Sequence, residues 1–349
     1  MDYKLSLDVS RPLALLKICP AYKQTPIVEI PAHNNLRLLV KDETNRMGLG
    51  SFKALGGIYA VAKFLLEQWQ KENGFELPAH RLIDPEIQSW SSKFTFVCAS
   101  AGNHGMAVAK GAELFNAGCR VHIARSVPTS FAQRLSALGA AVIRSGATYE
   151  QSMLAAMDEN SEGQVLLADS SWPGYCHLPM LVMEGYSVVA EEMRQGFLHD
   201  DSWPTHVFLQ AGVGGLAASI AFEIRKKWKH QPRIIVVEPQ AAPCLFESHK
   251  QGRLTKISGP ISSMGRLDCK EPSLIAFDIL NDLADDFVCV SDDEAATAVD
   301  YLAQHELSTT PSGAAGIAAI LINSELDSKE KLAIPDGSIC LAIASEGSL

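Results

Sequence analysis

Several features that would assign this chain to a special class are missing from its 349 residues. No stretch of 18 consecutive apolar residues occurs, so we expect no membrane-spanning helix. The first ten residues carry two aspartates and no apolar core, so we expect no signal peptide. There is no internal repeat at a fixed period and no low-complexity tract. We therefore expect a globular protein rather than a membrane, solenoid or disordered one.

Basic runs and paired cysteines are missing as well. Lys and Arg number 30 against 40 Asp and Glu, so the net charge is −10 and neither nucleic acid nor an anionic membrane is an expected partner. The 8 cysteines are scattered and none forms a CxxC pair, which argues against zinc, and we predict no metal site. We expect mostly buried thiols in a cytoplasmic protein.

The apolar residues that are present follow an α/β pattern. Hydrophobic residues make up 47% and charged residues 20%, and the length suggests about two domains. Short β-branched runs predict strands at residues 36–41, 94–99, 120–124, 140–144, 165–168, 206–210, 233–238 and 338–344. Helical spacing predicts helices at residues 106–116, 130–138, 149–159, 185–195 and 216–227. Alternating strands and helices predict parallel sheets flanked by helices. Residues 68–93 are polar without a clear period, and we interpret them as an insertion or a long connection.

Lys53 is the first candidate for chemistry. It follows a glycine-rich turn at residues 48–50, lies beside the apolar Phe52 and Leu55, and no acidic residue stands between it and Glu43. A lysine is ordinarily solvated, and that interpretation stays open. In an apolar pocket its pKa would fall and its amine could form a Schiff base.

Three other candidates follow predicted strands, where open parallel sheets bind ligands. The first is the turn at residues 100–105, whose helix start could hold a carboxylate or phosphate and where Asn103 offers an amide. The second is the loop at residues 210–216, with three glycines that let the backbone approach an anion. The third is Ser345, after the last strand. Each also has a purely structural interpretation, as a cap or a steric turn.

The four segments, taken in this order, resemble the fold type II pyridoxal-phosphate enzymes, a group that includes threonine dehydratase, the tryptophan synthase β chain and cysteine synthase. Within the group the resemblance is to the diaminopropionate ammonia-lyases. It is carried by residues 40–43, 48–57, 169–175 and 183–186, with further similarity at residues 237–239, 244–245 and 264–272. It covers nearly the whole chain except residues 68–93 and the two ends.

The resemblance implies a fold and a set of roles. We expect a two-domain enzyme with pyridoxal 5′-phosphate between the domains, the larger domain formed by residues 1–55 and 155–349 and the smaller by residues 56–154. Lys53 would hold the cofactor through a Schiff base. The cofactor phosphate would be bound by Gly212, Val213, Gly214 and Gly215. Asn103 would contact the ring hydroxyl of the cofactor, and Ser345 its ring nitrogen. The substrate would be bound by Ser100, Ala101, Gly102, Asn103 and Tyr175.

The resemblance also implies a reaction. A β-substituted L-amino acid would lose its leaving group by α,β-elimination and yield a 2-keto acid and ammonia, with 2,3-diaminopropionate as the expected substrate. An L-threonine or L-serine dehydratase, a β-replacement synthase, and a degenerate relative that binds the cofactor without catalysis remain alternatives. The relatives are mostly dimers, so we expect a homodimer. A disulfide between Cys244 and Cys269 and a pair of free thiols are both left open.

Two positions bear on stereochemistry. The family usually has an aspartate where this chain has Ala101, whereas threonine dehydratases share the alanine. Asp169 is retained, and the resemblance implies that it is the base for the L-isomer; its other interpretation is a strand-end cap. We therefore expect an enzyme restricted to L-amino acids. His104 is expected to be structural.

Overall fold

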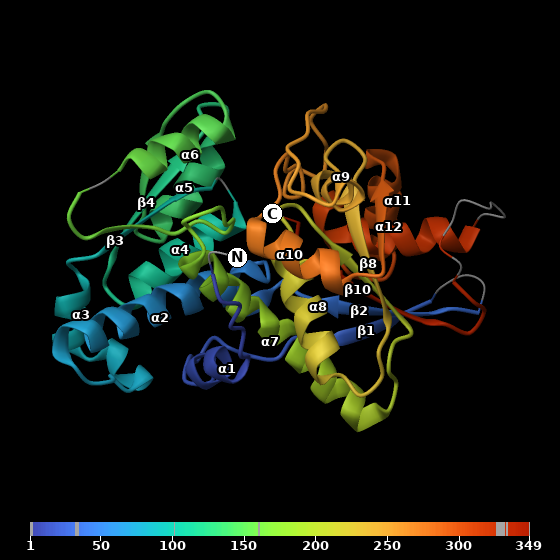
Figure 1. Cartoon of the computed structure of the whole chain (residues 1–349), viewed down its shortest axis with the longest axis horizontal. Helices are drawn as coiled ribbons and strands as arrows, with labels where there is room; N and C mark the ends of the chain where they lie inside the picture. Colours follow the sequence, from blue (N-terminus) through green and yellow to red (C-terminus); the bar gives the residue numbers. More distant parts are fainter. Residues whose placement is uncertain are drawn as a thin grey trace. The chain divides into compact units, whose positions relative to one another are not determined.

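The structure, a computed structural model, describes residues 3–31, 35–100, 102–159, 161–325, 332 and 334–348. The chain divides into two compact units, each with its own sheet (Figure 1). The first unit consists of Met1–Tyr22 and Lys53–Gly185, and the second of Lys23–Phe52 and Tyr186–Leu349. The boundaries differ from the predicted division at residues 55/56 and 154/155. Residue 154 lies inside a helix, and the strand that follows it pairs within the first unit.

The first unit is built on a parallel sheet. Among its described residues the strand order is β5-β4-β3-β6, and every pairing is parallel. The strands are β3 (Thr95–Ala99), β4 (Gly118–Ile123), β5 (Ala141–Arg144) and β6 (Gln164–Leu166). β3 is almost wholly apolar and buried, as expected for a central strand covered on both faces.

Helices surround this sheet. They are α1 (Ser10–Leu16), α2 (Lys53–Asn73), α3 (Pro85–Ser91), α4 (Asn103–Leu114), α5 (Thr129–Ala137), α6 (Tyr149–Asp158) and the first part of α7 (His177–Asp200). Glycines let α2 approach its neighbours closely. A Cβ on Gly185 of α7 would lie 2.6 Å from the Cα of Gly56, and a Cβ on Gly57 would lie 2.5 Å from the Cβ of Ala107 in α4. The start of α2 is thereby fixed against α4 and α7.

Residues 68–93, interpreted as an insertion or a long connection, lead from α2 to β3 and contain helical segments that the sequence analysis did not predict. α2 continues to Asn73, and a 3₁₀ helix (Ala79–Ile83) and α3 follow it. Aromatic rings pack this region together: Trp69 contacts Trp90 at 5.2 Å between ring centroids, and Trp90 contacts Phe94 at 5.2 Å. Leu82 and Ile87 in this region are also buried, and these few apolar residues are too widely spaced to give a clear helical period.

The second unit contains the larger sheet. In its described part the strand order is β1-β2-β10-β7-β8-β9, with β1 antiparallel to β2 and the other pairings parallel. The strands are β1 (Ile27–Ile30), β2 (Arg37–Asp42), β7 (His206–Gln210), β8 (Arg233–Pro239), β9 (Asp286–Val290) and β10 (Ile339–Ala344). The carboxyl ends of β7 and β10 lead into the predicted glycine loop and Ser345.

The helices of the second unit are the remainder of α7, a 3₁₀ turn (Arg46–Gly48), α8 (Gly215–Lys227), α9 (Cys244–Gln251), α10 (Leu274–Leu283), α11 (Asp292–Ala303) and α12 (Pro311–Glu325). α12 packs on β10 and β7, and small residues allow the contact. A Cβ on Gly316, for example, would lie 3.1 Å from the carbonyl oxygen of Phe208. The apolar core here includes Phe208, Val237 and Ile317.

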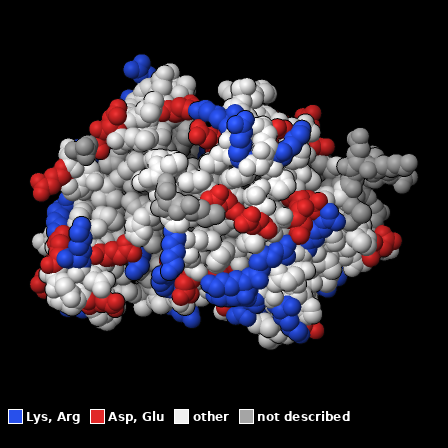
Figure 2. Space-filling model, in the orientation of Figure 1, with Lys and Arg blue, Asp and Glu red and all other residues white. Residues whose placement is uncertain are grey.

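The surface carries both signs of charge. On the face drawn in Figure 2, Lys and Arg side chains lie beside Asp and Glu side chains in many places. Surface ion pairs such as Arg225 with Asp285 and Lys110 with Glu113 also join opposite charges. In the described part of the chain, no helix combines the length and the apolar character that crossing a membrane requires.

Candidate active site

Lys53 is delivered by the connection between β2 and α2. Ser51 forms a β-bridge with Glu346, and the backbone N–H of Phe52 donates to the carbonyl oxygen of Ser345 at 3.3 Å. The ring of Phe52 also packs edge-on against Tyr186 at 4.8 Å. Lys53 is the next residue in the chain and opens α2. The residues directly before Lys53 are therefore fixed within the second unit.

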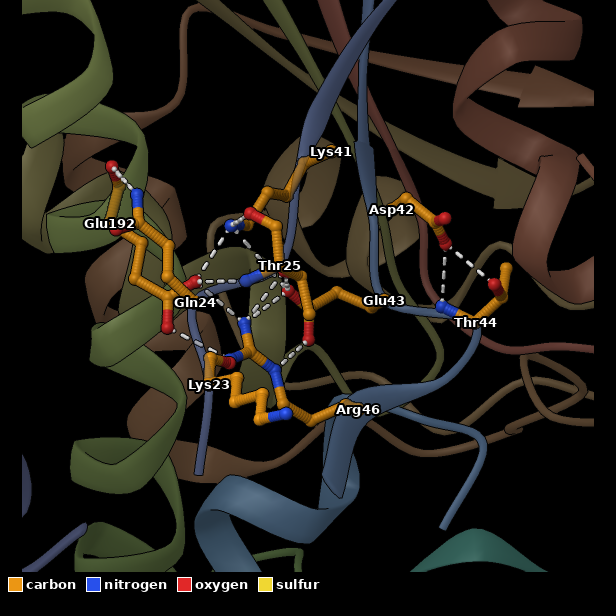
Figure 3. Close-up of polar contacts among 9 residues, drawn as sticks. All are labelled: Lys23, Gln24, Thr25, Lys41, Asp42, Glu43, Thr44, Arg46 and Glu192. Carbon is orange, nitrogen blue, oxygen red and sulfur yellow. Dashed lines mark hydrogen bonds and ion pairs between the residues drawn. The ribbon is translucent and has the colours of Figure 1, made fainter. Parts of the chain in front are cut away.

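A buried cluster of charges holds the start of this connection (Figure 3). Arg46 donates to Glu43 through Nε and Nη2, at 2.7 and 2.5 Å, and to Glu192 of α7 through Nη1 and Nη2, at 2.8 and 2.7 Å. Lys41 of β2 donates to Glu192 at 2.7 Å and to the carbonyl oxygen of Thr25 at 2.6 Å. The side chains of Lys41, Glu43 and Arg46 are 0% exposed and that of Glu192 is 4% exposed. We call these four residues the buried cluster.

The cluster shifts the pKa values of its own members. The carboxylates of Glu43 and Glu192 raise the pKa of Arg46, although burial acts in the opposite direction. Burial also opposes ionisation of Glu192, but Arg46 and Lys41 hold the pKa of its carboxyl below the ordinary value. Arg46 and Glu192 therefore stay charged at neutral pH.

In the first unit, Lys53 forms an ion pair with Asp169. Lys53 Nζ donates to Asp169 Oδ2, and the side chains are 22% and 16% exposed. Burial raises the pKa of the Asp169 carboxyl, but the charge of Lys53 and the hydrogen bond from Lys53 hold it well below its ordinary value. The structure thus brings together the two predicted catalytic residues, as an ammonium group and a carboxylate that solvent can reach.

Two side chains fix the segment that carries Asp169. The hydroxyl of Tyr175 donates to the carbonyl oxygen of Leu166 at 2.7 Å and accepts from the N–H of Ala168 at 3.1 Å. His104 Nε2 lies 2.8 Å from the carbonyl oxygen of Leu167. Tyr175 was predicted to contact substrate, and that role stays a prediction; its hydroxyl bonds to the backbone on both sides of Leu167.

The turn after β3 places Ser100, Gly102 and Asn103 at the start of α4. Ser100 Oγ accepts from the N–H of Gly102 at 3.2 Å, and Asn103 is the first helical residue. Gly102 is the N-cap and supplies no capping side chain, so the helix start presents bare backbone. Such a terminus suits a carboxylate. Ala101, also predicted to contact substrate, lies outside the described residues.

The second unit holds the other predicted group, the glycine loop between β7 and α8. Gly214 is the N-cap of α8 with φ +97°, a conformation that favours glycine, and it gives no side-chain cap. A Cβ on Gly214 would lie 2.9 Å from Leu245 Cδ1, and one on Gly212 would lie 3.0 Å from Cys269 Sγ. A side chain at Gly212 or Gly214 would therefore crowd its neighbours, and the first turn of α8 contains no acidic residue. These features fit a bound phosphate.

Ser345 directly follows β10 and is buried. The structure therefore places Lys53, Asn103 and Asp169 in the first unit, and the glycine loop and Ser345 in the second. Ser345 is uncharged, so it can exchange a hydrogen bond with a ring nitrogen but cannot serve as its counter-ion.

Sequence reasoning missed one buried acid beside the glycine loop. Glu238, near the end of β8, accepts from the N–H groups of Leu245 and Phe246 at 2.8 and 2.7 Å. Burial raises the pKa of its carboxyl to about 8, against the effect of those hydrogen bonds. The sequence does contain a signal for a buried acid at this position, because Glu238 follows four apolar residues of a predicted strand and precedes a proline. Nearby, Cys244 and Cys269 are not joined by a disulfide.

Comparisons with known proteins identify the family of the chain. A model of the family described as pyridoxal-phosphate dependent enzymes matches residues 18–345. Diaminopropionate ammonia-lyase from Salmonella typhimurium is 34% identical over 357 residues, covering 96% of this chain and 88% of the relative. L-threonine ammonia-lyase from Geobacter sulfurreducens is 30% identical over 247 residues, covering 70% of this chain and 58% of the relative.

A solved structure is similar over nearly the whole length. The crystal structure of holo diaminopropionate ammonia lyase from Escherichia coli covers 99% of this chain and 92% of its own, with a TM-score of 0.85 at 25% identity. The fold and its two-domain organisation are therefore shared with that protein.

Proposed function

The chain belongs to the pyridoxal-phosphate dependent enzymes, and from that premise we propose that it is an ammonia-lyase acting on a small β-substituted L-amino acid, with 2,3-diaminopropionate as the preferred substrate. The observation that carries the proposal is the ion pair between Lys53 and Asp169 at the start of α2. It supplies an amine and a carboxylate in one partly exposed place, as proton removal next to an amino group requires.

Pyridoxal 5′-phosphate is the cofactor, and when bound it stabilises the negative charge that develops at the substrate α-carbon. Lys53 would bind it covalently, and the backbone N–H groups of residues 212–215 would hold its phosphate. Asn103 would contact the ring hydroxyl, and Ser345 the ring nitrogen. Because Ser345 carries no charge, it would leave that nitrogen unprotonated, which favours prompt loss of a β leaving group over transamination.

Asp169 would remove the α-proton of an L-substrate. While Lys53 is an ammonium ion, it holds the pKa of Asp169 low and the carboxylate is a weak base. Without that charge, burial would raise the pKa of Asp169. Asp169 would therefore act as a base while Lys53 is an uncharged amine.

The substrate carboxylate would bind the turn at Ser100, Gly102 and Asn103. Elimination from 2,3-diaminopropionate would release one ammonia, and hydrolysis of the resulting enamine would give pyruvate and a second ammonia. A threonine or serine dehydratase is a second candidate, favoured by the similarity to an L-threonine ammonia-lyase. Either reaction uses the same ion pair.

We further propose that the enzyme is restricted to L-amino acids. Ala101 cannot accept a proton, so Asp169 and Lys53 are the candidate bases of the first unit. Turnover of the D- and L-isomers of 2,3-diaminopropionate tests this proposal. A D-isomer rate below about 1% of the L-isomer rate is expected from the loss of a general base, and equal rates would contradict the restriction.

The test of the function is a substrate panel. The purified holoenzyme is incubated with L-2,3-diaminopropionate, L-threonine, L-serine and O-acetyl-L-serine, and 2-keto acid and ammonia are measured, with Lys53→Ala as the control. Two ammonias per pyruvate with diaminopropionate as the best substrate would support the proposal. Faster turnover of threonine or serine would move the assignment to a dehydratase. Reaction of O-acetylserine alone, and mainly with an added nucleophile, would move it to a β-replacement synthase.

A homodimer and a cytoplasmic location remain predictions. The absence of a disulfide between Cys244 and Cys269 is compatible with a reducing compartment. Sedimentation of the purified protein would test the homodimer.

A further inference from the structure

Gln210, the last residue of β7, places a buried amide directly before the glycine loop. The residue is 2% exposed. Its Nε2 donates to the carbonyl oxygen of Ile343 in β10 at 2.7 Å and to the carbonyl oxygen of Gly313 in α12 at 3.1 Å. A side-chain amide has two N–H hydrogens, so both are used. One side chain therefore ties the end of β7 to β10 and to the start of α12.

The oxygen of the same amide gains nothing from this position. Gln210 Oε1 is buried and has no hydrogen-bond partner among the described residues, and a Cβ on Gly316 of α12 would lie 3.2 Å from it. A buried oxygen without a donor costs free energy, and an apolar side chain of similar shape would avoid that cost. What an amide supplies here is therefore its two donated hydrogen bonds.

The bond to Ile343 joins two strands whose pairing has already ended. β10 pairs with β2 as far as Ala344, but in the described part of the sheet its pairing with β7 ends at Leu341, opposite Val207. Continuing that register would bring Ala344 opposite Gln210. The two backbones therefore separate toward their carboxyl ends, and the Gln210 amide bridges the opening.

The segments on the two sides of this opening are the proposed cofactor contacts of the second unit. β7 leads into the glycine loop, and β10 leads into Ser345, two residues after Ile343. Open parallel sheets bind ligands outside the carboxyl ends of their strands. The second acceptor, Gly313, also lies close to this segment, because a Cβ on it would lie 3.0 Å from the carbonyl oxygen of Glu346. Gln210 thus connects the strand before the glycine loop to both segments that flank Ser345.

We propose that Gln210 is a positioning residue that sets the distance between the glycine loop and Ser345, so that one cofactor molecule can contact both. The inference rests on the cofactor contacts given under the proposed function. Pyridoxal 5′-phosphate carries its phosphate and its ring nitrogen on one small molecule, so the protein groups that bind them must keep a matching separation. Binding groups have to be held within about 0.5 Å of the required geometry by the residues behind them. Gln210 does this through the backbone of β10 and α12.

Gln210→Met tests the proposal, because methionine is similar in length and apolar but donates no hydrogen bond. We expect the Kd of pyridoxal 5′-phosphate, from absorbance titration of the full-length protein, to rise at least about tenfold. Inorganic phosphate reaches the glycine loop alone, so its Kd, measured by competition, should change less than about twofold. The unfolding midpoint of the cofactor-free protein should move by less than about 4 °C. An unchanged cofactor Kd, or equal weakening of both ligands, would overturn the proposal.

Gln231→Met is the matched control. Gln231 also donates through Nε2 to two backbone carbonyl oxygens, those of Ile224 and Trp228 at 3.0 and 2.9 Å, but it precedes the amino end of β8. Both Kd values should match those of the wild type in this variant. A rise in the cofactor Kd as large as that in Gln210→Met would show a general effect of losing such an amide and would contradict the proposal.

Gln210→Glu is a second variant, which keeps the shape of the side chain. A protonated carboxyl group donates one hydrogen bond and an ionised one donates none. We therefore expect the cofactor Kd, relative to the wild type at the same pH, to be higher at about pH 8 than at about pH 6. A wild-type cofactor Kd at both pH values would overturn the proposal.

Ser345→Ala shows whether Gln210 acts through the distance between the two contacts. Without the contact to the ring nitrogen that distance loses its importance, so adding Gln210→Met should raise the cofactor Kd less than about threefold further. A further rise as large as in the single variant would show that Gln210 supports the glycine loop alone, which contradicts the proposal. If these Kd values follow the expectation but no amino acid in the substrate panel is turned over, the proposed reaction fails and the positioning role stands. If the panel is turned over as proposed and Gln210→Met binds the cofactor like the wild type, the positioning role alone fails.

Discussion

The buried cluster of the second unit and the Lys53–Asp169 pair of the first unit both take charge out of water, but they differ in how completely they are enclosed. Arg46 directs all its N–H groups to acceptors, and the four cluster side chains are at most 4% exposed. Lys53 and Asp169 are 22% and 16% exposed, and Nδ1 of His104 has no hydrogen-bond partner among the described residues. The buried cluster is closed to solvent and ligands, whereas the Lys53–Asp169 pair is open and can still contact a ligand.

This difference separates a structural role from a chemical one. Burying ions costs more free energy than their attraction returns unless every polar atom is bonded, so a closed cluster specifies geometry. Here it fixes the connection that leads to Lys53. An open pair retains pKa values that change when one partner reacts, which a catalyst needs.

Breaking the open pair should have the largest effect. Lys53→Ala is expected to lower the rate of 2-keto acid formation at least about 10³-fold, because the amine that binds the cofactor is gone. Its unfolding midpoint should stay near that of the wild type. Absorbance of the bound cofactor and a thermal melt check both points.

The matched control is Lys63→Ala. Lys63 lies in the same helix, α2, and forms an ion pair with Glu67. It should retain full activity. If Lys53→Ala unfolded while keeping its activity per folded molecule, the pair would be structural and the comparison would fail.

Breaking the closed cluster should affect stability instead. Glu192→Gln leaves Arg46 and Lys41 buried with one carboxylate between them, and we expect a loss of about 3–5 kcal/mol in the free energy of unfolding. Urea denaturation measures it. Glu29→Gln, which disrupts the exposed pair with Arg37, should cost less than about 1 kcal/mol. Equal losses in the two variants would show that the cluster stabilises nothing beyond a surface pair.

The pH dependence of that loss sharpens the comparison. The pKa of Glu192 is held below its ordinary value of 4.5 in the folded protein, so its contribution is present above that value. The contribution is lost as the pH falls through the lower, folded-state pKa. The stability difference between wild type and Glu192→Gln should therefore be constant near neutral pH and shrink below about pH 4.5. A difference that grew on acidification would contradict the charged state assigned to the cluster.

The strands of the fold were largely predictable because buried parallel strands are continuous apolar runs. All eight predicted strands are present within a few residues. β1 and β9 were missed because they are short edge strands that include Glu29 and Asp286. Pairing with a neighbour, which sequence periodicity does not report, makes them strands.

The site residues that belong to sequence motifs were predictable, whereas those defined by contacts between distant parts of the chain were not. Lys53, Asp169 and the glycine loop stand in recognisable segments. Glu192 lies 146 residues from Arg46, so nothing local marks it as a partner. His104 resembled a structural histidine at a helix start, and only the folded chain shows that Nδ1 lacks a partner among the described residues.

The most direct test of the account is the rate of 2-keto acid formation from L-2,3-diaminopropionate by Asp169→Asn, per folded molecule of holoenzyme. The substitution preserves shape and removes the carboxylate that Lys53 contacts. We predict a kcat at least about 100-fold below that of the wild type, with an unfolding free energy changed far less than in Glu192→Gln. A kcat within about twofold of the wild type would contradict the claim that the open pair carries the chemistry.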